Sequence, residues 1–115
     1  MTASVSAHNG AEFPEYCASK GGVLAYTKNV ALRVAKYGAT CNSISAGGVI
    51  TELNAHILEN KSLWDQVMAE TLIPKWATVE EMAEWTYFLA VVNKSMTAQD
   101  VLIDNGEIAK ANFVW

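Results

Sequence analysis

Basic residues are scarce in this chain, and their scarcity narrows the functions that its sequence allows. Eight lysines and arginines stand against twelve aspartates and glutamates, which gives a formal net charge of −4 and a pI of about 5.0. A nucleic-acid-binding domain normally carries a basic patch, and a membrane-surface helix carries basic residues beside an apolar stripe. Neither pattern is present, so we expect no nucleic-acid partner and no membrane partner.

Long apolar runs and cysteines are also few. No run approaches the roughly 18 apolar residues that suggest a membrane-spanning helix, and the N-terminus lacks the basic and apolar segments of a signal peptide. Two cysteines, Cys17 and Cys41, are too few for a disulfide framework, and neither has a second Cys or a His at metal-ligand spacing. We therefore expect free thiols, no metal site and a cytoplasmic location.

The rest of the composition is that of a globular domain. Apolar residues make up 51% of the chain and charged residues 17%, which is too apolar for a disordered chain. A length of 115 residues indicates one domain or part of one. No linker, repeat or low-complexity stretch divides it, so residues 1–115 are expected to form a single unit.

Turn signals divide the chain into alternating strands and helices. They predict the end of a strand within residues 1–7, a loop over 8–12, and a long helix from about Glu15 to Tyr37 that Gly38 ends. Further expected elements are a strand at 40–45, helices near 51–58 and 63–68, a helix begun by a capping box at 78–81, a strand at 101–103 and an apolar tail at 113–115. This alternation predicts an α/β fold with a parallel sheet.

The long helix is apolar on two sides. One stripe is formed by Val23, Val30 and Val34, and the other by Leu24, Ala31 and Ala35. A helix that is apolar around most of its circumference is covered on more than one side. We therefore expect the sheet on one side and a second helix, of this chain or of a partner subunit, on the other.

Tyr16 and Lys20 are the residues with the clearest chemical potential. Their four-residue spacing places both on one face of the long helix, one turn apart. A phenol ordinarily has a pKa of about 10, and a neighbouring ammonium group favours its ionised form. Such a pair can exchange a proton with an alcohol or ketone oxygen, although most Tyr/Lys pairs at this spacing are ordinary helix surface.

Three other segments of the sequence give the Tyr16/Lys20 pair a more specific context. Thr2-Ala3-Ser4-Val5-Ser6 precedes it, and Asn42-Ser43-Ile44-Ser45-Ala46-Gly47-Gly48-Val49-Ile50-Thr51 and Thr97-Ala98-Gln99-Asp100-Val101-Leu102-Ile103-Asp104-Asn105-Gly106 follow. This ordered set resembles the short-chain dehydrogenase/reductase family over essentially the whole chain. The resemblance implies the C-terminal, catalytic half of a Rossmann-like doubly wound parallel sheet, with the N-terminal dinucleotide-binding strands missing. It also implies an NAD- or NADP-dependent enzyme that interconverts an alcohol and a ketone by hydride transfer.

The resemblance implies a role for each motif residue. Ser4 matches the family's catalytic serine, which hydrogen-bonds the substrate oxygen, with Ser6 as its competitor. Tyr16 matches the general acid/base. Lys20 matches the lysine that favours the phenolate and holds the ribose hydroxyls of the nicotinamide.

The segment after the second predicted strand matches the family's cofactor loop. There Gly47 and Gly48 would permit close backbone approach, and the Val49 amide and the Thr51 hydroxyl would meet the nicotinamide carboxamide. Without the family match, a simple strand-to-helix turn explains the segment equally well.

The sequence departs from the family pattern in several places. The phosphate-binding Gly-rich turn and the family's Asn-Ala-Gly segment and catalytic asparagine are absent, Ala46 stands for a proline, and Asn105 stands for a glycine. Two hypotheses therefore stand: part of an oxidoreductase that acts on a small alcohol or ketone, or a non-catalytic chain that serves as an oligomerisation surface. In both we expect a homodimer or homotetramer. The substrate and the choice between NAD and NADP are not determined, although the serine segment faintly resembles that of polyol and sugar reductases.

Other candidate residues have simpler readings. Trp64, Met68 and Leu72 are predicted either to line a substrate pocket or to form a core stripe. His8 and His56 show no partner in the sequence and are interpreted as loop and helix-surface residues.

Overall fold

The computed structural model describes residues 1–111, so the apolar tail expected at 113–115 lies outside the described residues. Three strands, β1 (Thr2–Ser4), β2 (Ser43–Ala46) and β3 (Asp100–Ile103), form one sheet in the order β1-β2-β3. Both pairs are parallel, and Ser4, Ala46 and Ile103 lie in register at the carboxyl end. The predicted α/β fold with a parallel sheet is confirmed.

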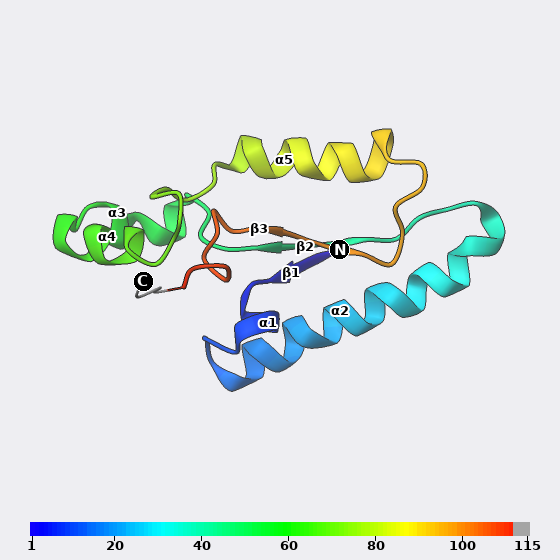
Figure 1. Cartoon of the computed structure of the whole chain (residues 1–115), viewed down its shortest axis with the longest axis horizontal. Helices are drawn as coiled ribbons and strands as arrows, with labels where there is room; N and C mark the ends of the chain where they lie inside the picture. Colours follow the sequence, from blue (N-terminus) through cyan, green and yellow to red (C-terminus); the bar gives the residue numbers. More distant parts are fainter. Residues whose placement is uncertain (112–115) are drawn as a thin grey trace.

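Helices lie on both faces of the sheet (Figure 1). On one face lie α1 (Ser6–Asn9) and the long α2 (Pro14–Val34), which continues into the 3-10 turn η1 (Ala35–Tyr37). On the other lies α5 (Val79–Tyr87), which continues into the π-helical η3 (Phe88–Val92). Beyond the carboxyl ends of the strands lie η2 (Glu52–Asn54), α3 (Ala55–Leu58) and α4 (Lys61–Met68).

The long helix has the predicted length and ends. Pro14 occupies its first turn, where a missing N–H costs nothing. Gly38 adopts a left-handed conformation with φ of 69° after η1 and ends the helical path. Thr27 and Ala31 are buried, whereas Tyr26 and Leu32 are exposed. Val23, Val30 and Val34 of the first apolar stripe are half-buried, and the second stripe is buried at Ala31 and exposed at Ala35.

The capping box predicted at the start of α5 is confirmed. The Thr78 hydroxyl accepts a hydrogen bond from the Glu81 amide at 3.2 Å, and the Glu81 carboxylate accepts one from the Thr78 amide at 2.8 Å. The Lys75 ammonium also donates to Glu81. The hydrogen bond from Lys75, followed by that from Thr78, lowers the pKa of the Glu81 carboxyl.

A single helical turn replaces the start of the predicted 8–12 loop. Ser6–Asn9 form α1, and Gly10, with φ of 69°, closes the turn by donating to the Ser6 carbonyl at 3.0 Å. Four residues are too few to show a helical period, which is why the sequence pattern did not reveal this turn.

The molecule exposes more surface than one compact domain of its mass. Its accessible area is 7731 Å² and its radius of gyration is 15.8 Å. A compact domain of this size would expose about 6,200 Å² and have a radius of about 13 Å. Few apolar residues of the described chain are buried, namely Ala3, Val5, Ala31, Ile44 and Ala77. No helix in residues 1–111 combines the length and apolarity needed to cross a membrane.

Candidate active site

A cavity of about 440 Å³ lies at the carboxyl ends of β1 and β2. In a parallel sheet this edge is where ligands bind, because neighbouring loops diverge there. Five of the predicted site residues line the cavity, namely Ser4, Tyr16, Gly47, Gly48 and Val49. The fold thus brings together side chains and backbone from three segments that are far apart in the sequence.

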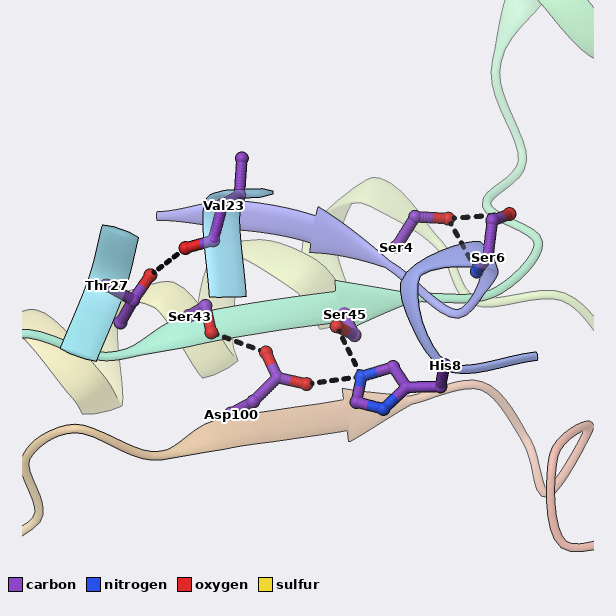
Figure 2. A network of polar contacts seen from close by, with 8 residues as sticks. All are labelled: Ser4, Ser6, His8, Val23, Thr27, Ser43, Ser45 and Asp100. Carbon is purple, nitrogen blue, oxygen red and sulfur yellow. Dashed lines mark hydrogen bonds and ion pairs between the residues drawn. The ribbon is translucent and has the colours of Figure 1, made fainter. Parts of the chain in front are cut away.

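The serine segment is fixed by its own hydrogen bonds (Figure 2). The Ser4 hydroxyl donates to the Ser6 hydroxyl at 3.2 Å and accepts from the Ser6 amide at the same distance. The Val5 amide donates to the Ala46 carbonyl at 3.0 Å, which ties the end of β1 to β2. Ser4 and Ser6 both line the cavity, so the structure brings both predicted serines to the site.

Tyr16 and Lys20 lie together on α2, as their spacing predicts. Tyr16 lines the cavity and is 42% exposed. The Lys20 ammonium nitrogen lies 5.6 Å from the centre of the Tyr16 ring and donates to the Thr2 carbonyl at 3.2 Å. Lys20 itself is not among the lining residues. This hydrogen bond to β1 holds the Lys20 ammonium group beside the Tyr16 ring.

The two glycines of the loop after β2 are tightly covered. A Cβ on Gly48 would lie 2.1 Å from Nε1 of Trp76, and one on Gly47 would lie 2.9 Å from a carboxylate oxygen of Glu107. No larger residue fits at Gly48 unless the indole moves. The protein's own side chains make the close approach to these two glycines, and the contact of Gly47 and Gly48 with a cofactor stays a prediction.

The next residues of the loop present more than one free backbone donor, because the N–H groups of Val49 and Thr51 both lack a hydrogen-bond partner within residues 1–111. The Val49 carbonyl accepts from the Asn54 side-chain amide at 2.9 Å, and the Thr51 hydroxyl donates to the Asn54 carbonyl oxygen at 2.5 Å. Thr51 is predicted to contact a cofactor, but it does not line the cavity. The Asn54 side chain, which the sequence analysis did not identify, is hydrogen-bonded both to the Val49 carbonyl and to the Thr51 hydroxyl.

Val5 and Phe13 contribute to the apolar wall of the cavity, and the rest of its large apolar side chains after the glycine loop come from the segment between that loop and α5. Those from this segment are Ile57, Val67 and Trp76. Trp64 packs edge-on against Trp76 with ring centres 5.4 Å apart, so it supports the wall from behind. Neither Trp64, Met68 nor Leu72 is among the lining residues. Trp64 and Met68 are half-buried and Leu72 is 57% exposed, so the three residues do not form a buried core stripe either.

Carboxylates dominate the charge of the cavity. Glu12, Glu70 and Glu107 line it, and no lysine or arginine does. Burial raises the pKa of the Glu107 carboxyl, and the charges of Asp104, Glu70 and Glu12 raise it further. The described part of the chain contains no group of three Cys, His, Asp or Glu side chains that could hold a metal ion.

The interpretation of His8 as a loop residue without a partner is wrong. His8 lies on α1, and its Nε2 atom is 2.8 Å from Asp100 Oδ2 and 3.1 Å from Ser45 Oγ (Figure 2). Asp100 is 92 positions away along the chain. Only the folded sheet brings the two residues together.

Comparison with known proteins agrees with the fold. The model of a family described as enoyl-(acyl carrier protein) reductase matches residues 1–107. The chain is 28% identical over 108 residues to an L-rhamnose 1-dehydrogenase (NADP(+)) of Thermoplasma acidophilum, covering 92% of this chain and 42% of that protein.

Solved structures share the same arrangement. A protein of Thermus thermophilus named TT0495 superposes with a TM-score of 0.85 at 26% identity, over 96% of this chain and 48% of that one. A 4-hydroxyisoleucine dehydrogenase mutant, complexed with NADH and succinate, superposes with a TM-score of 0.83 at 29% identity, over 96% and 46%. The chain spans less than half the length of these relatives. Together with the family match over nearly its whole length, they establish that this chain belongs to the short-chain dehydrogenase/reductase family.

Proposed function

We propose that this chain is the catalytic part of an NAD(P)-dependent oxidoreductase that interconverts a small alcohol and a ketone. One observation carries the proposal: the Ser4 and Tyr16 side chains share a cavity with the Gly47–Val49 backbone. A hydroxyl donor and a phenol on neighbouring walls can both reach one substrate oxygen. That arrangement suits the proton-transfer half of an alcohol oxidation.

Each residue has a distinct chemical task in this proposal. The Tyr16 phenol exchanges a proton with the substrate oxygen, and the Lys20 ammonium lies beside it, 5.6 Å from the ring centre. The Ser4 hydroxyl turns from Ser6 to the substrate oxygen while its bond from the Ser6 amide is kept. The nicotinamide cofactor, when bound, supplies or accepts the hydride.

The loop after β2 fits the carboxamide end of such a cofactor. Val49 lines the cavity and its N–H has no hydrogen-bond partner among residues 1–111, and a carboxamide oxygen would satisfy that donor. The sequence contains no Gly-x-Gly-x-x-Gly turn for the pyrophosphate. We therefore expect residues 1–115 alone to bind NAD or NADP weakly or not at all by calorimetry, and saturable tight binding would contradict that.

The activity is tested with the longest natural protein that contains this chain. It is mixed with NAD or NADP and with L-rhamnose, a panel of polyols and 4-hydroxyisoleucine, and the absorbance of reduced nicotinamide is followed. We expect at least one alcohol to yield reduced cofactor and a carbonyl product in equal amounts. If both cofactors bind but no member of the panel is oxidised, and no ketone is reduced in the reverse direction, the assignment loses its support.

A second role, as an oligomerisation surface, has an observation of its own. The outer side of the α2–η1 helix exposes Tyr26 at 60%, Leu32 at 79% and Tyr37 at 75%. A symmetric dimer could bury such a side against its own copy. We propose a homodimer or homotetramer, and light scattering of wild-type and Leu32→Asp proteins tests it. A Leu32→Asp protein with the wild-type mass would argue against α2 as the interface.

A further inference from the structure

Polar side chains lie along the sheet face beneath α1 and α2, and hydrogen bonds join four of them, Ser43, Asp100, His8 and Ser45, into one network (Figure 2). Ser43 and Thr27 are 1% exposed and Ser45 is 0% exposed. Polar groups in such a place cost stability unless they are hydrogen-bonded. In the described residues, no buried side-chain nitrogen or oxygen lacks a partner, so this network is complete.

Asp100 and His8 close the network at its outer end. Asp100 Oδ1 accepts from the Ser43 hydroxyl at 2.5 Å, and Oδ2 lies 2.8 Å from His8 Nε2. The Asp100 and His8 side chains are 17% and 30% exposed. An ionised carboxylate only accepts hydrogen bonds. His8 Nε2 therefore carries a hydrogen and donates it to Asp100.

The same geometry excludes a hydrolytic triad. In a serine–histidine–aspartate triad one ring nitrogen faces the serine and the other faces the aspartate. Here Ser45 and Asp100 both lie against Nε2, and Ser45 has no exposed surface. The network binds elements of the fold to one another.

His8 joins the serine segment to the sheet. It supplies the only side-chain hydrogen bonds from α1 to β2 and β3 among residues 1–111. The same turn begins with Ser6, whose amide and hydroxyl both contact the Ser4 hydroxyl. A shift of α1 away from β3 would therefore move both groups that orient Ser4.

We propose that His8 is a positioning residue, which holds α1 against Asp100 so that Ser6 keeps the Ser4 hydroxyl directed toward the cavity. The inference rests on the proposed function, because Ser4 must act on the substrate for its orientation to matter. Sub-ångström placement of such a group has a large effect on rate, since a misplacement of about 1 Å costs up to roughly 100-fold.

Three variants of the longest natural protein separate this role from general packing. His8→Phe keeps the ring and removes the N–H. His8→Gln places an amide N–H close to the position of Nε2. His56→Phe changes the other histidine, which lies exposed on α3. With NADP and an alcohol that the wild-type protein oxidises, we expect His8→Phe to lower kcat about 10- to 100-fold with an unchanged KM for NADP. His8→Gln should recover most of the rate, and His56→Phe should match wild type.

The decisive comparison repeats His8→Phe in a Ser4→Ala background. If His8 acts through Ser4, its substitution has little further effect there, because coupled residues are not additive. A full and equal loss in both backgrounds would overturn the proposal while leaving the proposed function standing. If Ser4→Ala alone leaves turnover unchanged, the assigned role of Ser4 in the proposed function fails as well.

A measurement that needs no substrate completes the test. Hydrogen exchange at the Ser6 amide, which donates to Ser4, reports the order of α1 directly. We expect faster exchange in His8→Phe and near wild-type exchange in His8→Gln. Unchanged exchange in His8→Phe would show that α1 does not depend on His8 and would overturn the proposal.

Discussion

The two faces of the sheet are built in different ways. The face under α1 and α2 holds buried polar side chains that are all hydrogen-bonded, among them Thr27 and Ser45, and Ser4 and Tyr16 lie at one end of it. On the opposite face, α5 and η3 contain no buried residue. Their apolar side chains remain partly in solvent: Trp85, Phe88, Val91 and Val92 are exposed by 40 to 50%.

This difference teaches which kind of interaction fixes the site. Hydrogen bonds hold the serine segment, the loop after β2 and the network around His8 and Asp100. Each hydrogen bond is directional and tolerates only a narrow range of distances and angles. Apolar burial, which tolerates sliding, contributes little on either face because the described core is small. We therefore expect the α1–α2 face to respond sharply to single atoms and the α5 face to respond weakly.

Removing the phenolic oxygen of Tyr16 should have the largest effect. In the longest natural protein, Tyr16→Phe deletes the proposed proton-transfer atom and should lower kcat by about 10²- to 10⁴-fold with little change in cofactor affinity. Steady-state kinetics and calorimetry measure the two quantities. Tyr26→Phe is the matched control on the same helix, since Tyr26 is 60% exposed and lies outside the cavity. Equal rates for the two variants would remove Tyr16 from the mechanism.

A methyl group at Gly48 should break the packing of the site. Its Cβ would overlap Trp76 at 2.1 Å, so Gly48→Ala should lower the free energy of unfolding by about 1–3 kcal/mol. Gly22→Ala is the matched control, because a Cβ at Gly22 on α2 meets nothing within 4 Å and helical alanine is favoured by about 0.5–1 kcal/mol. Thermal and denaturant unfolding should therefore move in opposite directions for the two variants. A shift of the same sign would contradict the account.

Substitution of one threonine on each side of the sheet compares the stability contributions of the two faces directly. Thr27 on α2 and Thr86 on α5 each donate to the carbonyl four residues earlier, at 2.8 and 2.9 Å. Thr27 is 1% exposed, whereas Thr86 is exposed. We expect Thr27→Ala to destabilise by about 1–2 kcal/mol and Thr86→Ala to stay within about 0.5 kcal/mol of wild type. Chemical denaturation measures both, and equal losses would mean that the faces do not differ as proposed.

The smallest effects should come from two glutamates with opposite pH dependence. Burial raises the pKa of Glu107 above the ordinary value of 4.5, so its folded-state advantage exists below that value and is lost as pH rises through the raised pKa. Glu107→Gln should therefore raise the melting temperature at pH 7 and make little difference in acid.

Glu81 provides the opposite sign. The hydrogen bond from Lys75 lowers its pKa, so its contribution is present above the ordinary value and disappears as pH falls through the lowered pKa. Glu81→Gln should therefore lower the melting temperature at neutral pH, with the difference vanishing in acid. Melting curves across this range check both signs, and parallel behaviour of the two variants would contradict the assigned causes.

Local patterns predicted much of the fold. Pro14 and Gly38 mark the ends of the α2–η1 helix, and the Thr78–Glu81 box marks the start of α5. Each of these signals acts over a few residues, where backbone chemistry decides the conformation. The cavity residues Ser4 and Tyr16 were likewise found from short motifs whose context resembles a family.

Contacts between distant segments could not be read in the same way. The His8–Asp100 bond spans 92 positions, and Trp76 covers Gly48 only because the chain returns after Pro74. Asn54 clamps the Val49 carbonyl, although an asparagine in a helical turn carries no signal of that role. Such pairings depend on the folded geometry, and no periodicity or spacing encodes them.

The most direct test of the account is a structure of the longest natural protein with its cofactor and an alcohol substrate bound. Tyr16 Oη and Ser4 Oγ should both lie within about 2.6–3.2 Å of the reacting oxygen, with the Val49 amide on the nicotinamide carboxamide. A substrate oxygen bound out of reach of both hydroxyls, or a nicotinamide seated away from the Gly47–Val49 loop, would contradict the account.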